Sequence, residues 1–378
     1  MSMRAVRAGL TAAGAAGALA ALGVRRPLIT RWPASILQAA PCTPASEAPG
    51  AMLLLHGALG LASLAAGGIA GAVTNGAAVA ALAGLRGDAG RSAAVLADAV
   101  PGSGTPGRGR LPAGRGARRR WLRAADVAYG PHPQQRLDVW AGAEAGPSAP
   151  VLVQVHGGGW TGGDKVLSAA PLLAHLAARG WVCVTVDYRL APAHRLADQI
   201  ADVRAALEWV SAHVAEYGGD PGFVAISGGS AGGHLASLAA VTGAPVAAAV
   251  PFYGVHDFSL DSGGLHDLLR DNVIGTALAD DPAGWFALSP LHNAGPDAPP
   301  FLVVHGTTDT IVTVEQSRRF VVRLREVSRQ PVAYAELPHA QHGFDSLPTA
   351  RTAHTVLAVT RWLEGLRAQR RAAAHRAA

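Results

Sequence analysis

Cysteine, aromatic residues and charge are all scarce in this sequence. The chain has 378 residues, of which 5% are aromatic and 15% are charged, and its two cysteines are Cys42 and Cys183. Two isolated cysteines exclude a disulfide framework, and they lack the spacing of a metal site. With 49% hydrophobic residues, so low a share of charge predicts that some segment is buried in protein or in lipid. The length allows a large core and more than one structural unit.

Basic residues gather in one short stretch, residues 108–123. The net charge of the chain is +6, and the stretch contains Arg108, Arg110, Arg115, Arg118, Arg119, Arg120 and Arg123. Its one aromatic residue is Trp121, whereas a nucleic-acid site needs several interleaved aromatic residues or a recognised module. We therefore expect no nucleic-acid partner. Two interpretations stay open, contact with an anionic membrane surface beside an apolar segment and a solvated flexible linker.

Residues 1–100 contain two long runs without charge. The first, residues 8–24, lies between Arg7 and Arg25 and resembles a signal sequence or a short membrane anchor, although no convincing cleavage site follows it. The second, residues 51–85, exceeds the roughly 20 apolar residues that cross a bilayer. This part of the chain is therefore either membrane-associated or an alanine-rich helical cap. Residues 101–125, rich in glycine, proline and arginine, are typical of a linker.

Strand-like and helix-like stretches alternate from residue 126 onward. Strands are expected at residues 126–129, 136–140, 151–155, 181–187, 223–227, 247–252, 301–305 and 332–337, and helices at 169–178, 200–214, 314–327 and 351–369. The first two strands resemble an antiparallel hairpin. The others are continuous apolar runs, which predict a mostly parallel sheet covered by helices on both faces. The fold class is therefore α/β, with a main domain at residues 126–367 and a basic tail at 368–378.

A glycine-flanked serine follows one of these strands. Ser230 lies between Gly228 and Gly232, and an alanine- and leucine-rich helix is expected from Ala231 onward. Strand, Gly-x-Ser-x-Gly and helix together form the pattern of a nucleophile elbow. The serine of an elbow sits in a strained turn, so the residues two before and two after it should lack a Cβ. The following helix would direct its positive end at negative charge developing beside Ser230.

Two further residues supply what a serine nucleophile needs. A neutral hydroxyl requires a base, and that base requires an acid to orient it. His342 follows the strand at 332–337, and Asp309 follows the strand at 301–305 by four residues. The order Ser230, Asp309, His342 matches the α/β-hydrolases rather than the chymotrypsin or subtilisin types. His339 is the rival base, although Pro338 before it and the Gly-Phe after His342 favour His342.

A glycine-rich turn follows the strand at 151–155, in His156-Gly157-Gly158-Gly159-Trp160. Acyl transfer builds negative charge on the former carbonyl oxygen, and backbone N–H groups must already face that oxygen. We assign these donors to Gly158, Gly159 and Ala231. Trp160 lines the acyl pocket or belongs to the core. Asp187, Tyr188 and Arg189 are interpreted as structural residues that hold the glycine turn.

These motifs resemble the hormone-sensitive-lipase-like family of carboxylesterases, which has the α/β-hydrolase fold. The resemblance rests on residues 156–160, on Asp187-Tyr188-Arg189-Leu190-Ala191-Pro192 and on Gly228-Gly229-Ser230-Ala231-Gly232-Gly233, and it covers residues 125 to 367. The family commonly has an acidic residue before the nucleophile, where this chain has Gly229, a departure that leans toward the feruloyl-esterase-like branch. The apolar, basic N-terminal part resembles the cell-envelope lipid esterases of mycobacteria and their actinobacterial relatives.

The resemblance implies a serine esterase that hydrolyses short- to medium-chain acyl esters, with a small-molecule or lipid ester as substrate and without a metal or cofactor. Such an enzyme would act at a membrane or cell envelope, or otherwise in the cytoplasm. An amidase or peptidase with the same triad is the alternative within enzymes. A non-catalytic binding protein on the same scaffold and a membrane-anchored scaffold are the alternatives from other classes.

Overall fold

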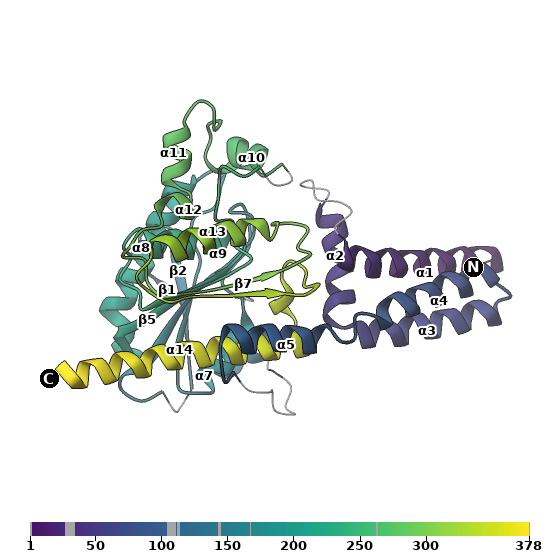
Figure 1. Cartoon of the computed structure of the whole chain (residues 1–378), viewed down its shortest axis with the longest axis horizontal. Coiled ribbons are helices and arrows are strands. Elements are labelled where there is room, and N and C mark those ends of the chain that lie inside the picture. Colours follow the sequence, from purple (N-terminus) through teal and green to yellow (C-terminus); the bar gives the residue numbers. More distant parts are fainter. Residues whose placement is uncertain are drawn as a thin grey trace.

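An eight-stranded sheet organises the chain from residue 122 to residue 337 (Figure 1). The computed structural model describes residues 2–26, 35–103, 111, 114–142, 145–166, 168–261 and 264–377. In sheet order the strands are β1 (Leu122–Ala128), β2 (Arg136–Ala141), β4 (Val182–Val186), β3 (Ala149–Val155), β5 (Gly219–Gly229), β6 (Ala248–Phe252), β7 (Phe301–Gly306) and β8 (Val332–Leu337). β1 and β2 pair antiparallel, as does β2 with β4, and every later pairing is parallel. The predicted hairpin and mostly parallel sheet are confirmed.

Helices cover both faces of the sheet because its central strands are apolar on both sides. One face packs against α8 (Leu196–His213), α9 (Ala231–Val241) and α13 (Glu315–Val327). The opposite face packs against α5 (Asp88–Ala99), α7 (Ala170–Ala177) and α14 (Ala350–Ala377). The side chains of β3 point alternately to the two faces of the sheet, since Val151 and Val153 belong to the core on the first face and Leu152 to the core on the second. In Figure 1 α13 lies above the sheet and α14 below it.

The segment between β6 and β7 rises from one side of the sheet as short helical turns. It contains α10 (Leu265–Leu268), the π-helical turn η2 (Leu269–Val273), α11 (Pro282–Ala287) and α12 (Pro290–Asn293). Trp285 of α11 is fully buried, and its indole N–H donates to the carbonyl of Thr276 at 3.0 Å. Leu265 and Leu268 from this segment line the pocket described below. Two 3-10 turns, η1 (Val214–Tyr217) and η3 (Phe344–Ser346), follow α8 and β8.

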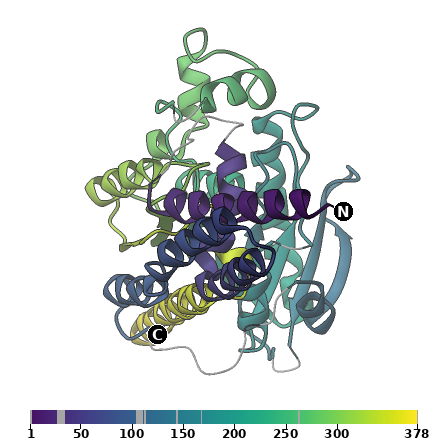
Figure 2. The ribbon, with the colours of Figure 1, turned by 90° about the vertical axis from the view of Figure 1, so that its right-hand side faces the viewer.

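The N-terminal helices form a bundle that projects from the sheet to the right in Figure 1 and lies in front of it in Figure 2, where α1 runs across the view. The bundle consists of α1 (Met3–Arg25), α3 (Pro49–Ala65) and α4 (Ile69–Ala83), with α4 packed on the other two, and α2 (Ser35–Glu47) joins it to the main domain. Inside it, Nδ1 of His56 lies 2.8 Å from the side-chain oxygen of Asn75. By length and composition, helices at Met3–Arg25 and Ile69–Ala99 can cross a membrane, and a bent pair, Gln38–Glu47 with Pro49–Ala65, is a third candidate.

Three expectations differ from the structure at their edges. The linker at 101–125 contains a helix, α6 (Gly114–Trp121), and the start of β1; residues 104–110 and 112–113 of it lie outside the described residues. Within residues 1–100, α5 belongs to the main domain, because Leu96 joins the core beneath β8. The final helix continues to Ala377 instead of ending near residue 369, so the expected tail at 368–378 is helical through residue 377.

Candidate active site

Ser230 occupies the sharp turn between β5 and α9. Its backbone has φ 57° and ψ −123°, a conformation that L-residues rarely adopt and that surrounding structure must impose. A Cβ on Gly228 would lie 2.3 Å from the carbonyl oxygen of Gly232, and one on Gly232 would lie 2.2 Å from that of Val155. Side chains at either position would therefore open the turn. This local geometry is the one that the Gly-x-Ser-x-Gly spacing predicts.

The glycine turn after β3 lies directly against Ser230. A Cβ on Gly157 would be 3.3 Å from the Cβ of Ser230. Gly158 and Gly159 have φ values of 131° and 60°, which are accessible to glycine and turn the backbone back toward the serine. Ala231 is the first residue of the 11-residue helix α9, so its N–H is among those with no partner inside the helix. The three residues assigned as oxyanion donors thus come from two segments that meet at Ser230.

Asp309 and His342 meet at the ends of β7 and β8. Nδ1 of His342 lies 2.7 Å from Oδ2 of Asp309. The other carboxylate oxygen of Asp309 accepts hydrogen bonds from the N–H groups of Ile311 and Val312, each at 2.9 Å. Burial alone would raise the pKa of Asp309, but His342 and His305 beside it hold that pKa below its usual value. Asp309 is therefore an ionised, immobilised carboxylate that fixes the orientation of the His342 ring.

Residues after β4 hold the glycine turn in place. The Tyr188 hydroxyl donates to the carbonyl of His156 at 3.1 Å, and the two rings stack with centroids 4.3 Å apart. Asp187 accepts from the backbone N–H of Lys165 at 2.6 Å and from its ammonium at 2.9 Å. Arg189 instead forms an ion pair with Asp202 of α8 at 2.7 Å. Tyr188 and Asp187 contact the turn as expected, whereas Arg189 acts on the helix behind it.

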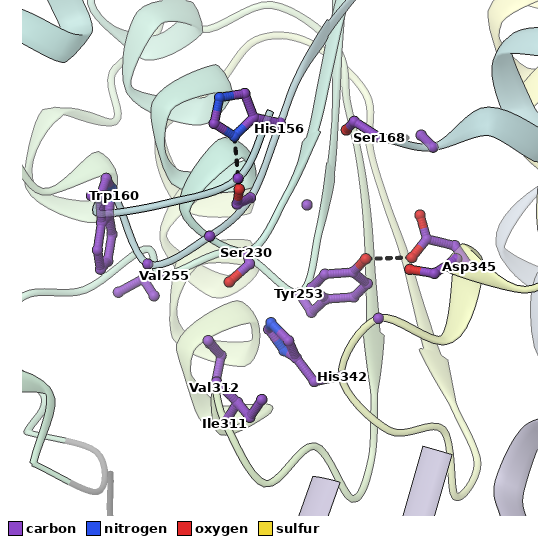
Figure 3. A pocket seen from close by; sticks show the side chains of 18 of the residues that line it. His156, Trp160, Ser168, Ser230, Tyr253, Val255, Ile311, Val312, His342 and Asp345 are labelled. Carbon is purple, nitrogen blue, oxygen red and sulfur yellow. Dashed lines mark hydrogen bonds between the residues drawn. The ribbon is translucent and has the colours of Figure 1, made fainter. Parts of the chain in front are cut away.

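Ser230 and His342 line one pocket of about 580 Å³, shown in Figure 3. Trp160 also lines it and is at the same time a core residue, since its indole N–H donates to Nδ1 of the buried His234 at 3.3 Å. Trp160 therefore lines the pocket and also belongs to the core. The other lining residues are Gln154, His156, Gly157, Gly158, Gly159, Gly163, Asp164, Ser168, Ala169, Gly229, Tyr253, Val255, Leu265, Leu268, Ile311, Val312, Gly343, Asp345 and Ser346.

His339, the rival base, contacts α5 instead of the pocket that Ser230 and His342 line. Its Nδ1 lies 3.1 Å from a carboxylate oxygen of Asp88 on α5, and it is not among the residues that line the pocket. The described residues also contain no group of three or more His, Cys, Asp or Glu side chains placed to hold a metal ion.

Tyr253 and Asp345 are site residues that the sequence does not reveal. The Tyr253 ring lies 4.5 Å from that of His342, and its hydroxyl donates to Oδ1 of Asp345. A Cβ on Gly229 would be 2.9 Å from that hydroxyl oxygen. The absence of an acidic residue at position 229 thus leaves room for the Tyr253 ring. The signal in the sequence was Gly229 itself, the one departure from the family's elbow.

A family model described as BD-FAE matches residues 137–324. Among curated proteins, a probable carboxylic ester hydrolase of Mycobacterium tuberculosis, LipM, is 46% identical over 63% of this chain and 60% of its own length. Esterase LipC of the same organism is 40% identical over 65% of this chain and 66% of its own length. The matched segment therefore spans somewhat less than two thirds of these relatives.

Solved structures give the same fold. A carbohydrate esterase from gut microbiota superposes with a TM-score of 0.56 at 20% identity, covering 64% of this chain and 97% of the other. A thermophilic esterase of Thermogutta terrifontis superposes with a TM-score of 0.52 at 28% identity, covering 63% and 91%. The chain thus has the α/β-hydrolase fold, and its sequence relatives make it similar to the hormone-sensitive-lipase-like carboxylesterases.

Proposed function

We propose that this chain is a serine carboxylesterase that uses Ser230, His342 and Asp309 as its triad. The observation that carries the proposal is the 2.7 Å contact between Nδ1 of His342 and the buried Asp309, next to the strained Ser230 in the same pocket. With Nδ1–H donated to the carboxylate, the other ring nitrogen is the acceptor that a serine hydroxyl needs.

The reaction follows from this arrangement. Ser230 Oγ bonds to the ester carbonyl carbon as His342 takes the hydroxyl proton, and the N–H groups of Gly158, Gly159 and Ala231 receive the oxyanion. The bond between that carbon and the alcohol oxygen then breaks, and His342 returns the proton to the leaving alcohol. Water, deprotonated by His342, attacks the acyl-enzyme and releases the acid with Ser230 restored.

The apolar part of the pocket supports a short- to medium-chain acyl group. Val255, Leu265, Leu268, Ile311 and Val312 line it together with Trp160. Side chains of this kind bind alkyl groups by removing their surface from water, at about 0.8 kcal/mol per buried CH₂. The volume of about 580 Å³ must also hold the alcohol part, which limits the acyl chain.

Hydrolysis of p-nitrophenyl butyrate by the full chain and by Ser230→Ala tests the proposal. We expect the variant to lose at least about 10³-fold in kcat, and a fluorophosphonate to label the wild type but not the variant. Wild-type turnover by Ser230→Ala would overturn the mechanism. Turnover of butyryl p-nitroanilide at a rate comparable to that of the ester would indicate an amidase. If the wild type neither hydrolyses p-nitrophenyl butyrate nor reacts with the fluorophosphonate, a binding protein is favoured.

We also propose that the bundle of α1, α3 and α4 inserts into a membrane. Residues 8–24 and 48–85 carry no charge, and 17 helical residues rise about 25 Å, close to the thickness of a bilayer core. Among the described residues, the large exposed hydrophobic side chains belong to these three helices except for Val322 and Leu347. Leu54, Ile69 and Leu61 are 78%, 76% and 71% exposed, an apolar surface that lipid would cover.

The basic stretch at residues 108–123 supports membrane binding less strongly than the bundle does. Arg118 is paired with Asp138 at 2.6 Å, whereas Arg119, Arg120 and Arg123 are exposed. Arg108 and Arg110 lie outside the described residues. We propose that the exposed arginines can add attraction to an anionic surface, each by about 1 kcal/mol.

Flotation of the full chain with liposomes tests the insertion. We expect the triple variant Leu54→Lys, Leu61→Lys, Ile69→Lys no longer to float with the liposomes, because each lysine at bilayer depth costs about 3 kcal/mol. Val322→Lys changes an exposed hydrophobic residue outside the bundle and should float like the wild type. Flotation of the triple variant at the wild-type level would show that the bundle does not carry the attachment.

A further inference from the structure

His305 is a fully buried histidine near the end of β7. Its Nε2 lies 2.9 Å from the carbonyl oxygen of Val312 and 3.4 Å from Oδ2 of Asp309. Both oxygens can only accept while Asp309 is ionised, so Nε2 must carry a proton. Oδ2 is also the oxygen that Nδ1 of His342 contacts at 2.7 Å. Two imidazole rings therefore face one carboxylate oxygen.

Ser317 of α13 fixes the other side of the His305 ring. Its hydroxyl lies 2.7 Å from Nδ1 of His305, and the residue is fully buried. In the neutral ring with its proton on Nε2, Nδ1 is an acceptor, so Ser317 donates to it. A hydrogen bond accepted at Nδ1 polarises the ring and strengthens the donor at Nε2. Ser317 and His305 thus form a polar chain that leads from α13 to the carboxylate of Asp309.

The same ring closes the loop that carries Asp309. This loop begins directly after His305 and extends to Val312, whose carbonyl accepts from the ring. Within the loop, Oδ1 of Asp309 accepts from two backbone N–H groups. Loss of the His305 N–H would remove a donor from a buried carbonyl, which costs about 1–3 kcal/mol, and would release the far end of the loop. The position of Asp309, and through it that of the His342 ring, therefore depends on His305.

Other titratable or charged groups face the two rings from neighbouring elements. Those near His305 are Glu336 of β8, which pairs with Arg318 at 2.5 Å, and His256 after β6. Those near His342 are Tyr253 after β6 and Asp345 of η3. Substitution of His305 or Ser317 leaves all of these groups in place. A change in the pH dependence of such a variant therefore reports the altered contact with Asp309.

We propose that His305 is a positioning residue of the esterase, which holds Asp309 in place and weakens the attraction of its carboxylate for a proton on His342. The inference rests on the proposed triad, because His305 acts through Asp309 and His342. An N–H group facing Oδ2 compensates part of the negative charge of the carboxylate. Without this N–H, the protonated form of His342 is favoured, so Ser230 loses its base at a higher pH.

The pH dependence of kcat/KM for p-nitrophenyl butyrate tests this role. In His305→Leu, which has no donor, we expect kcat to fall at least about tenfold, because Asp309 is less well held. The midpoint of the fall in kcat/KM toward low pH should move up by about 0.5–1 unit, the effect of one hydrogen bond on a nearby charge. His305→Gln keeps an N–H donor and should return the midpoint to the wild-type value. An unmoved midpoint in His305→Leu, or one that His305→Gln does not restore, would overturn the proposal.

Ser317→Ala tests the same chain without changing the ring. It should move the midpoint in the same direction by a smaller amount, because the His305 donor is weakened but not removed. If His305→Leu does not fold, Ser317→Ala decides the question, and an unmoved midpoint in it overturns the proposal.

His256→Leu is the matched control, the same substitution at another fully buried histidine, whose ring stacks on Phe320. It removes packing and a buried ring but no donor to Asp309, so its midpoint should equal that of the wild type. A shift in His256→Leu as large as that in His305→Leu would assign the effect to packing and overturn the specific role of His305.

Labelling by a fluorophosphonate separates failure of this inference from failure of the proposed function. If the wild type is labelled at Ser230 and active while the midpoints of the His305 and Ser317 variants stay unmoved, the positioning role fails and the esterase stands. If the wild type is neither labelled nor active, the proposed triad itself has failed.

Discussion

Glu47 of α2 and Arg351 of α14 form a buried ion pair where the N-terminal helices meet the sheet. Glu47 also accepts from the hydroxyl of Thr349 at 3.2 Å, and Arg351 donates to the carbonyl of Pro338 at 3.1 Å. Pro338 and Thr349 lie at the two ends of the loop that carries His342. The N-terminal segment is thus connected by specific polar contacts to the loop that carries His342.

Removal of the Glu47 carboxylate should destabilise the protein strongly. Glu47→Ala leaves the Arg351 guanidinium, which is 2% exposed, without its partner, and an uncompensated buried charge costs about 3–5 kcal/mol. The free energy of unfolding, measured in detergent by urea titration, should fall by that amount, and kcat should fall with it because the His342 loop is loosened.

The matched control for Glu47 lies on α14 itself. Glu364 pairs with Arg179 at 2.9 Å, but both side chains are substantially exposed, so Glu364→Ala should cost less than about 1 kcal/mol. Equal losses in the two variants would contradict a special role for the Glu47–Arg351 pair.

A carboxylate at position 229 should impair the enzyme, although it restores the residue that the family commonly has there. In Gly229→Asp the new Cβ would lie about 3 Å from the Tyr253 ring, so the ring must move and its hydrogen bond to Asp345 is lost. We expect kcat/KM to fall by at least about tenfold on p-nitrophenyl butyrate. Adding Tyr253→Ala should recover part of the loss by making space. Wild-type activity in Gly229→Asp alone would show that Tyr253 is not fixed.

Asp309 should stay ionised wherever the protein is folded. A depressed carboxyl pKa contributes stability that is present above the ordinary value of 3.8 and is lost only as the pH falls through the lower folded-state pKa. The fall of kcat/KM toward low pH therefore reports the protonation of another group. In Asp309→Asn we expect this one-proton fall to remain, while kcat decreases by about 10³–10⁴-fold. A pH–rate profile of Asp309→Asn that has lost its acid limb would assign the titration to Asp309.

The sequence was sufficient for the elements of the sheet and for the meeting of Asp309 with His342. Both residues follow apolar strands, and parallel strands bring their carboxyl ends to one edge whatever their order. Tyr253, Asp345 and Gln154 could not be found in this way. Their proximity depends on the lateral order β3-β5-β6-β7-β8 and on side-chain directions, which no local pattern encodes.

The sequence does not indicate that α5 packs on the sheet, and the reason is different. Residues 1–100 are so rich in alanine and glycine that a helix facing protein and a helix facing lipid look alike. The distinguishing signal was the four-residue spacing of Asp88, Ser92 and Leu96, all of which are buried in the structure. A buried aspartate at that spacing requires a polar partner, which His339 provides.

Buried histidines should make the protein less stable in mild acid, and His234 offers a direct test. Burial, opposed by its hydrogen bond to the Leu288 carbonyl, lowers the pKa of His234 to about 4. Its Nε2 lies 2.8 Å from that carbonyl and its Nδ1 accepts from Trp160, so a second ring proton would point at the indole N–H. Below pH 6.5 His234 becomes protonated in the unfolded chain but stays neutral in the folded chain, so the free energy of unfolding decreases until the pH approaches 4.

For this one histidine the loss between pH 7.5 and pH 5 is about 2 kcal/mol. His234→Gln keeps an acceptor for Trp160 and a donor for Leu288 but cannot ionise, so the difference between its unfolding free energies at the two pH values should shrink by that amount. Part of the dependence will remain, because burial also lowers the pKa of His256. His213→Gln changes a histidine that is 46% exposed and should retain the wild-type difference. If His234→Gln also retained the wild-type difference, the acid sensitivity would come from other groups. The contact between Trp160 and His234 would then contribute nothing to the acid sensitivity.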